Sequence, residues 1–346
     1  MITASAPGKV ILCGEHAVVY GRPAIAVPVA YVQARVALEE NPAGLLIRAV
    51  DLNQSDRYTD LDPAHPLAAI IRLTLLTLGG AAVPNATLTI TSTIPAASGL
   101  GSGAAVSTAI VRALAQYYGH DLSTQTISDL VYQVEKIHHG TPSGIDNTVI
   151  AYAQPVYFKR PSPNLENPLP TPPQSAAVRV TEPAPLCFGD YPDPQPATIQ
   201  PFPVPTPFTL LIADTGIASP TRIVVGDVRQ AWESDRARYE SLFDQCGQIA
   251  EAAYHLIRNG RPLELGPLLT QNQAVLRDMG VSSPDLDALV QAALASGALG
   301  AKLSGGGRGG NMIALVTDET AARVEAALLK TRAKRVITTV VGESEN

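Results

Sequence analysis

The segment at residues 95–105, Pro-Ala-Ala-Ser-Gly-Leu-Gly-Ser-Gly-Ala-Ala, constrains the fold more than any other part of the chain. It follows residues 86–93, where Thr alternates with Leu or Ile as in a strand, and it opens a small-residue run at 103–118 with helical character. Its three glycines permit a tight turn and remove side chains that would block close approach. Backbone N–H groups of the loop and of the first helical turn then converge at the positive end of the helix dipole. This arrangement predicts an anion site, most naturally a phosphate site.

The same segment is compatible with other interpretations. Gly99-Leu-Gly101-Ser-Gly-Ala104 matches the dinucleotide pattern G-x-G-x-x-G/A, but the acidic residue expected after the next strand is missing, since Asp121 merely precedes another helix. The P-loop pattern fails because the only Gly-Lys pair, Gly8-Lys9, is followed by Val10. A glycine-rich bend used only for packing stays open as the simplest alternative.

A second glycine-rich segment lies near the C-terminus, between two strand-like runs. Five of the six residues at 305–310 are glycine, and ordering them costs backbone entropy that a plain connector would avoid. A tight loop beside a ligand explains this better than a flexible linker, although a purely structural turn is the alternative. A third unusual segment lies at the other end of the chain, at residues 5–21, and contains Lys9 and His16. Each of these residues considered alone is explained more simply, Lys9 as a solvated surface lysine and His16 as a structural histidine.

Composition excludes several classes of partner. A net charge of −6, without long Lys/Arg runs, argues against nucleic acid or an acidic membrane surface. Three scattered cysteines, Cys13, Cys187 and Cys246, suit a reducing cytoplasm and make a disulfide framework or a metal cluster improbable. Lys9 and Glu15 interrupt the N-terminal apolar stretch, which argues against a signal peptide. We therefore expect a cytoplasmic protein that binds a small anionic ligand through local groups.

The length of 346 residues and a 46% hydrophobic content predict two domains, each with alternating strands and helices. Residues 155–207 hold sixteen of the twenty-nine prolines, so we expect an irregular insertion or lobe boundary there and place the domains at 1–207 and 208–346. The expected strands are 2–13, 24–38, 86–93, 208–213, 300–303, 312–316 and 335–341. The expected helices are 64–78, 103–118, 123–139, 222–259, 262–279, 285–296 and 319–333, and 146–152 is a short helix or the start of a strand.

Together the three segments resemble the motifs of the GHMP small-molecule kinases. The first is Ala6-Pro-Gly-Lys-Val-Ile-Leu-Cys-Gly-Glu-His-Ala-Val-Val-Tyr-Gly21, without the Thr-Asp that follows Gly-Glu-His in galactokinases. A fourth block, Glu135-Lys-Ile-His-His-Gly-Thr-Pro-Ser-Gly-Ile-Asp-Asn147, is similar to that of the members that phosphorylate mevalonate. The resemblance implies an α+β fold, with an N-terminal lobe like ribosomal S5 domain 2 and a ferredoxin-like C-terminal lobe. It also implies ATP and mevalonate as substrates, Mg²⁺ as cofactor, and homodimers as a common state.

By the same resemblance, Asp146 is the base that accepts the substrate hydroxyl proton, and Lys9 stabilises the developing alkoxide and the γ-phosphoryl charge. A carboxylate is too weak a base to deprotonate an alcohol beforehand, so proton transfer accompanies a late stage of attack. Glu135 and Ser102 are the expected Mg²⁺ ligands, while Glu15, His16 and Thr221 join Lys9 and Asp146 on the substrate side. The ATP-binding residues are expected to be Pro95, Ala96, Ala97, Ser98, Gly99, Leu100, Gly101, Ser102, Gly103 and Ala104. The C-terminal glycine loop is expected at Ser304, Gly305, Gly306 and Gly307.

Two positions depart from the family pattern. Gly103 stands where a second Ser usually ligates Mg²⁺, which leaves Ser102, a water, or Glu135 with the phosphates to complete the metal shell. Arg308 replaces a more usual glycine and either touches phosphate or faces solvent.

Other interpretations stay open at this point. Without the family, Asp146 is equally a helix N-cap and Glu135 a solvated helix face. Alternative functions are a sister kinase that acts on phosphomevalonate or another hydroxy acid, a non-catalytic metabolite sensor, and a Rossmann oxidoreductase.

Overall fold

The first two strands organise the N-terminal lobe. In the computed structural model, which describes residues 1–95, 98–139, 144–159, 198–218 and 221–342, β1 (Ile2–Cys13) pairs antiparallel with β2 (Pro23–Glu40). The C-terminal half of β2 also pairs with β5, and its N-terminal end pairs with β6, in the order β4-β3-β5-β2-β6-β7. The other strands of this sheet are β3 (Leu46–Ala49), β4 (Gln54–Arg57), β5 (Ala86–Ser92), β6 (Val156–Lys159) and β7 (Thr198–Pro201).

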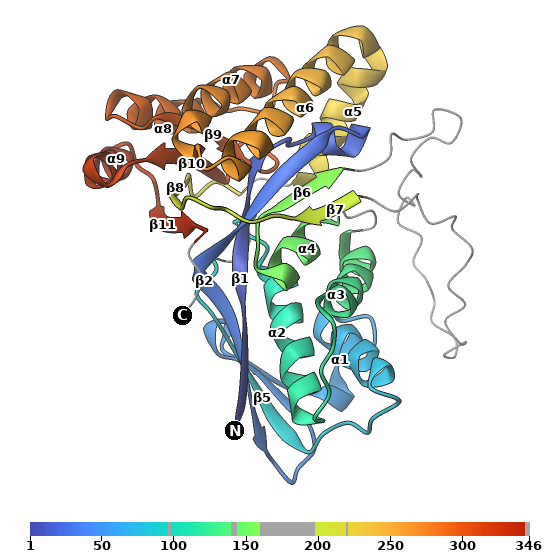
Figure 1. Cartoon of the computed structure of the whole chain (residues 1–346). Helices are drawn as coiled ribbons and strands as arrows, with labels where there is room; N and C mark the ends of the chain where they lie inside the picture. The colour runs from blue at the N-terminus through green and yellow to red at the C-terminus, as the bar shows by residue number, and fades with distance from the viewer. Residues whose placement is uncertain (96–97, 140–143, 160–197, 219–220, 343–346) are drawn as a thin grey trace.

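Four helices lie together on one side of this sheet (Figure 1). They are α1 (Pro66–Thr77), α2 (Ser102–Tyr117), α3 (Thr124–His139) and α4 (Ile145–Tyr152). The buried face of α2 is rich in alanine, including Ala104, Ala105, Ala109 and Ala113, and these small side chains let the helix pack closely on β1 and β2. The predicted cap of α3 is confirmed, because Ser123 Oγ accepts a hydrogen bond of 3.1 Å from the Thr126 N–H.

The C-terminal lobe is built on an antiparallel sheet in the order β11-β8-β10-β9. In chain order these strands are the fourth, first, third and second, which is the ferredoxin-like arrangement expected from the sequence. The strands are β8 (Phe208–Asp214), β9 (Gly300–Ser304), β10 (Asn311–Val316) and β11 (Arg335–Val341). The helices are α5 (Thr221–Ser234), α6 (Arg236–Arg258), α7 (Leu265–Asp278), α8 (Pro284–Ala295) and α9 (Asp318–Lys330).

The structure corrects three expectations about elements. The single helix expected at 222–259 is two helices, because Asp235 leaves helical geometry and its side chain accepts a hydrogen bond from the Arg238 N–H, capping α6. The proline-rich stretch 155–207 is not irregular throughout, since β6 and β7 lie at its two ends and pair with each other. The short strands β3 and β4 were not expected from the sequence. Residues 160–197, with Cys187, lie outside the described ranges.

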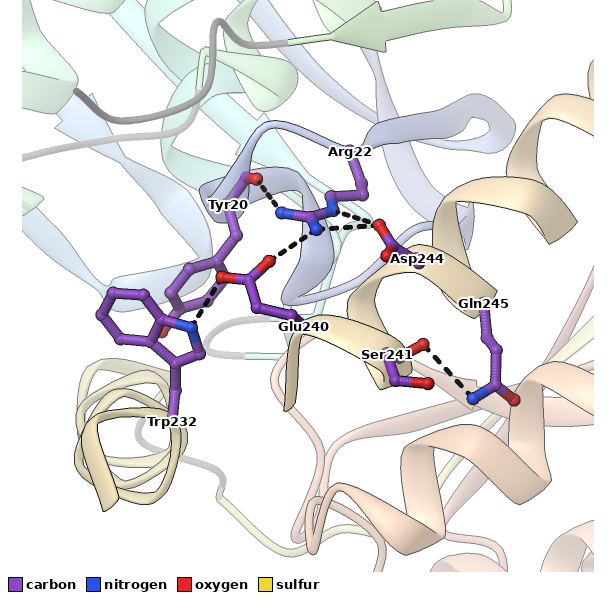
Figure 2. A network of polar contacts seen from close by, with 7 residues as sticks. All are labelled: Tyr20, Arg22, Trp232, Glu240, Ser241, Asp244 and Gln245. Atoms are coloured by element: carbon purple, nitrogen blue, oxygen red, sulfur yellow. Dashed lines mark hydrogen bonds and ion pairs between the residues drawn. The ribbon is translucent and has the colours of Figure 1, made fainter. Parts of the chain in front are cut away.

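One large apolar core continues from one sheet to the other, beside a smaller cluster around Phe158, and polar contacts join the lobes at the edge of the large core. Tyr20, in a 3-10 turn after β1, stacks on Phe243 of α6 with ring centroids 4.0 Å apart. Arg22 donates to the Tyr20 carbonyl at 2.7 Å and to the carboxylates of Glu240 and Asp244 on α6, and the Trp232 indole N–H also donates to Glu240 (Figure 2). Arg22 thus fixes the end of the first motif to the second lobe.

Two further observations concern the described residues as a whole. Cys13 and Cys246 are buried free thiols, and burial raises the pKa of both, that of Cys246 to about 12. Within the ranges given above, no helix combines the length and the apolar character that crossing a bilayer requires.

Candidate active site

Lys9 and Asp146 form an ion pair at the centre of the candidate site. The Lys9 ammonium lies 3.0 Å from the Asp146 carboxylate, although 137 positions separate them in the chain. The Lys9 side chain is 6% exposed, whereas that of Asp146 is 34% exposed. A buried cation therefore faces a carboxylate that solvent or a substrate can still reach.

A bulge in the first sheet aims Lys9 at this point. The pairing of β1 with β2 shifts register between Pro7 and Gly8, and such bulges redirect the next side chain. The Lys9 N–H then bonds the Leu100 carbonyl at 3.0 Å instead of a strand partner. Gly8 makes this approach possible, because a Cβ there would lie 3.2 Å from the Leu100 oxygen.

Asp146 occupies the first turn of α4 and is not its N-cap. The N-cap is Gly144, with φ of +86° and no side-chain hydrogen bond. An acidic side chain in the first turn is favoured by the helix dipole. Because the carboxylate points to Lys9 instead of to the backbone of its own helix, the capping alternative is wrong.

The predicted phosphate loop leads into the N-terminus of α2. Gly101 caps this helix with φ of +76° and, having no side chain, makes no capping hydrogen bond to its first N–H groups. A Cβ at Gly101 would lie 2.7 Å from Ile150 Cδ1 and 3.1 Å from Lys9 Cγ, so the loop packs directly on the lysine. Gly99 has φ of +77° with open space around its Cβ position. Unfilled N–H groups at a helix N-terminus beside an ammonium fit an anion such as phosphate.

Other members of the predicted loop are used internally. The Ser98 hydroxyl donates to the Pro95 carbonyl at 2.8 Å, so it closes the turn. The Ser98 carbonyl in turn accepts from the side chain of Asn311. Ala96 and Ala97 lie outside the described residues.

Glu135, the expected Mg²⁺ ligand on α3, lies next to the start of α2. Its Oε1 is 3.8 Å from the position that a Cβ of Gly103 would occupy. Ser102 is the first residue of α2 and is half-buried. In the part of the chain that the structure describes, no three His, Cys, Asp or Glu side chains gather into a metal cluster.

The C-terminal glycine loop joins β9 to β10 and contacts the turn after β1. The Ser304 hydroxyl donates to the Ile11 carbonyl at 2.8 Å, and His16 Nε2 lies 3.0 Å from the Gly306 carbonyl. Gly306 also packs against Thr221 at the start of α5, where an added Cβ would lie 3.0 Å from the Thr221 Oγ1. The tertiary structure therefore brings His16, Thr221 and the loop together.

His16 is held neutral by its surroundings. Burial lowers its pKa to about 4, and the charges of Arg308 and Lys302 act in the same direction. Because the Gly306 carbonyl only accepts, Nε2 carries the ring proton and Nδ1 is an acceptor. Nδ1 is buried and has no hydrogen-bond partner among the described residues, so it can accept a bond from a donor placed beside it.

Glu15 and Arg308 have partners that the sequence did not predict. The Glu15 carboxylate is 1% exposed and pairs with the Lys302 ammonium, so its observed contact is internal. Arg308 is half-exposed, bonds the Gly280 carbonyl at 3.2 Å and pairs with Asp227 of α5. Arg308 therefore faces solvent, which is one of the two expected alternatives, with its guanidinium bonded to Asp227 and to the Gly280 carbonyl.

Sequence reasoning missed Lys302, Arg22 and Asn311. Lys302 and Asn311 border the C-terminal glycine loop. Their place beside this loop was the only feature of the sequence that could have marked them as site residues. Arg22 immediately follows the first motif. Their partners lie more than 200 positions away, so their roles were not visible in the local pattern.

Comparison with known proteins agrees with this geometry. Family models describe residues 67–154 as the N-terminal domain of GHMP kinases and residues 253–334 as their C-terminal domain. The mevalonate kinase of Thermococcus onnurineus is 31% identical over 340 residues, covering 92% of this chain and 90% of that protein. The structure of L. major mevalonate kinase in complex with R-mevalonate superposes with a TM-score of 0.78 at 25% identity, covering 99% and 97% of the two chains. A Streptococcus pneumoniae phosphomevalonate kinase shares the fold, with a TM-score of 0.75 at 17% identity.

The two glycine loops, the lysine–aspartate pair and the ferredoxin-like second lobe define a small-molecule kinase, and the chain belongs to the GHMP kinase family. Curated relatives that match over about nine tenths of its length include the mevalonate kinases of Thermococcus onnurineus and Thermococcus sibiricus.

Proposed function

We propose that this chain transfers the γ-phosphoryl group of ATP to the 5-hydroxyl of mevalonate and releases 5-phosphomevalonate and ADP. The observation that carries the proposal is the Lys9–Asp146 pair, 3.0 Å apart, in contact with the glycine loop at the N-terminus of α2. The names of the relatives support mevalonate as the alcohol.

In the proposed mechanism, the side chains mainly position the reactants and neutralise charge, as phosphoryl transfer requires. Asp146 accepts the hydroxyl proton as the oxygen attacks phosphorus in line with the leaving group. Lys9 stabilises the negative charge shared between the attacking oxygen and the transferred group. The N–H groups at the start of α2 hold the phosphates, and Gly99 and Gly101 keep this approach free of side chains.

Mg²⁺ fits beside Glu135 and Ser102. Held there, the ion would supply positive charge that neutralises the phosphate oxygens. Glu135 supplies a hard carboxylate oxygen, as Mg²⁺ prefers, and Ser102 supplies the hydroxyl that Gly103 lacks.

On the substrate side, we place His16 and Thr221 around the alcohol. The unpartnered Nδ1 of His16 is an acceptor for a donor on the substrate, and Thr221 supplies an exposed hydroxyl next to the glycine loop. Glu15 pairs with Lys302 through Oε1, while its Oε2 is buried without a hydrogen-bond partner among the described residues, so Glu15 stays a candidate on the substrate side.

The test is an ATP-dependent assay with mevalonate, ADP release measured by a coupled enzyme and the product identified by mass spectrometry. The expected product is mevalonate plus one phosphoryl group at the primary alcohol. A screen with phosphomevalonate and other hydroxy acids in place of mevalonate addresses the sister-kinase alternative. Faster turnover of one of those compounds would move the assignment to that substrate, and ADP release from none would favour a non-catalytic sensor.

A further inference from the structure

A fully buried ion pair joins the two lobes next to the candidate site. Lys302 of β9 is 0% exposed and Glu15 of the turn after β1 is 1% exposed, and 287 positions separate them in the chain. The Lys302 ammonium also donates to the carbonyl of Leu303. Neither residue belongs to the Lys9–Asp146 pair that the proposed chemistry uses.

Stability alone is a poor explanation for such a pair. Moving two charges out of water costs about as much as their attraction returns, and apolar side chains of similar volume often stabilise equally well. Burial accordingly raises the pKa of Glu15, while Lys302 and the N–H groups of Glu15 and Gly305 oppose that rise. What a buried pair supplies instead is a fixed geometry between the elements that carry it.

The elements that it fixes are the turn at 14–16 and the C-terminal glycine loop. The turn has a strained backbone, with φ of +58° at His16 and +92° at Gly14. The loop is five-sixths glycine at 305–310 and has little conformational preference of its own. Two hydrogen bonds, Ser304 to Ile11 and His16 to Gly306, flank the ion pair and join the same two segments.

The phosphate side of the site is held by other contacts. The Lys9 N–H bonds the Leu100 carbonyl, and the Asn311 side chain bonds the Ser98 carbonyl. Neither bond passes through Glu15 or Lys302. Loss of the buried pair would therefore loosen His16, Gly306 and the adjoining Thr221 before it disturbed the phosphate loop.

We propose that Lys302, acting through Glu15, is a positioning residue that sets the glycine loop against His16 and so shapes the alcohol-binding side of the site. This inference rests on the proposed function, because it assumes that the alcohol binds beside His16.

The test removes both charges at nearly constant volume with the double variant Glu15→Gln/Lys302→Met. Because a displacement of about 1 Å near the reacting groups can cost up to about 100-fold, we expect the KM for mevalonate to rise by about 10- to 100-fold. The Kd for ATP, measured by isothermal titration calorimetry without mevalonate, should stay within about twofold, because its contacts are separate. An unchanged KM for mevalonate overturns the proposal, and so does an equal loss of affinity for mevalonate and for ATP.

A second measurement does not depend on turnover. Amide hydrogen exchange should become faster at residues 14–16 and 303–310 in the double variant, and stay unchanged at 98–104. Unchanged exchange at the glycine loop overturns the positioning role whatever the substrate is. Failure of the unmodified protein to phosphorylate mevalonate contradicts the proposed function instead.

Two comparison variants complete the design. Glu15→Gln alone keeps an oxygen for the Lys302 ammonium, so it should raise the KM for mevalonate less than the double variant does. This single variant also provides the test if the double variant does not fold. Arg22→Gln removes another ion pair between the lobes, at Glu240 and Asp244, and should leave the KM for mevalonate within about twofold. A KM increase of equal size in Arg22→Gln would point to general lobe loosening and overturn the specific role of Lys302.

Discussion

The contact of Asp146 that supports its proposed role as the base is the ion pair with the ammonium of Lys9. Asp146→Asn keeps the size of the side chain but removes the proton acceptor, so kcat should fall by about 10²–10⁴-fold. The phosphate loop does not use this carboxylate, so the Kd for ATP should stay nearly unchanged in calorimetry. Turnover at the normal rate would rule out Asp146 as the base.

Lys9→Met keeps the aliphatic stem that packs on Gly101 but removes the charge. The developing negative charge then loses its buried cation, and the rate should fall by several orders of magnitude in the coupled ADP assay. A loss of tenfold or less would reduce Lys9 to a binding contact.

His16 predicts a pH dependence of folding stability. Its pKa is lowered to about 4 in the folded state from 6.5, so the unfolded chain binds a proton first as the pH falls. Stability is therefore complete above pH 6.5 and decreases as the pH falls toward 4, by about 2 kcal/mol at pH 5. Urea unfolding at pH 7.5 and pH 5 measures this loss. The control is His16→Asn, because asparagine tolerates positive φ and does not titrate in this range. Between pH 7.5 and pH 5 this variant should lose about 2 kcal/mol less unfolding free energy than the unmodified protein.

Among the elements, the loop before α2 depends on two glycines for different reasons. A Cβ at Gly101 would overlap Ile150 and push on Lys9, in addition to the cost of its positive φ. We expect Gly101→Ala to lose about 2–4 kcal/mol of stability and to lower kcat because Lys9 is displaced.

Gly99→Ala is the matched control for that prediction. Gly99 has nearly the same φ, +77°, but no atom of the described residues lies within 4 Å of its Cβ position. Only the backbone cost of about 1–2 kcal/mol should remain. Urea unfolding and kcat measure both variants, and equal effects would show that the contact with Lys9 is unimportant.

At the scale of the whole molecule, the Arg22 contacts link the lobes (Figure 2). Arg22 is mostly buried and bonds two carboxylates and a carbonyl, so Arg22→Gln should lower the free energy of unfolding by about 1–2 kcal/mol. The control Arg261→Gln breaks an exposed pair with Glu264 within one turn and should lower the free energy of unfolding, measured with urea, much less than Arg22→Gln does. Equal losses would mean that the contact between the lobes adds nothing to stability.

The local sequence pattern determined most elements of the fold and the identity of the loops. The alternation of Thr with Leu or Ile predicted β5, and the run of small residues predicted α2. The glycines of 99–103 predicted a phosphate site, because the conformational freedom of glycine is a local property. Asp235 was missed as a helix break because its cap competes with helical residues on both sides. The strands β6 and β7 were missed because prolines disfavour strands, yet β6 pairs with β2 and β7 pairs in turn with β6, so the sheet supplies their partners.

By itself the sequence specified which residues carry chemistry, since lysine, aspartate and glycine loops have their properties wherever they lie. Only the tertiary structure decided which of them meet. It brought Lys9 to Asp146, and it turned Glu15 inward to Lys302, a contact between positions 287 apart. Such long-range pairings depend on how two sheets pack on one core, and a local pattern of residues carries no information about that packing.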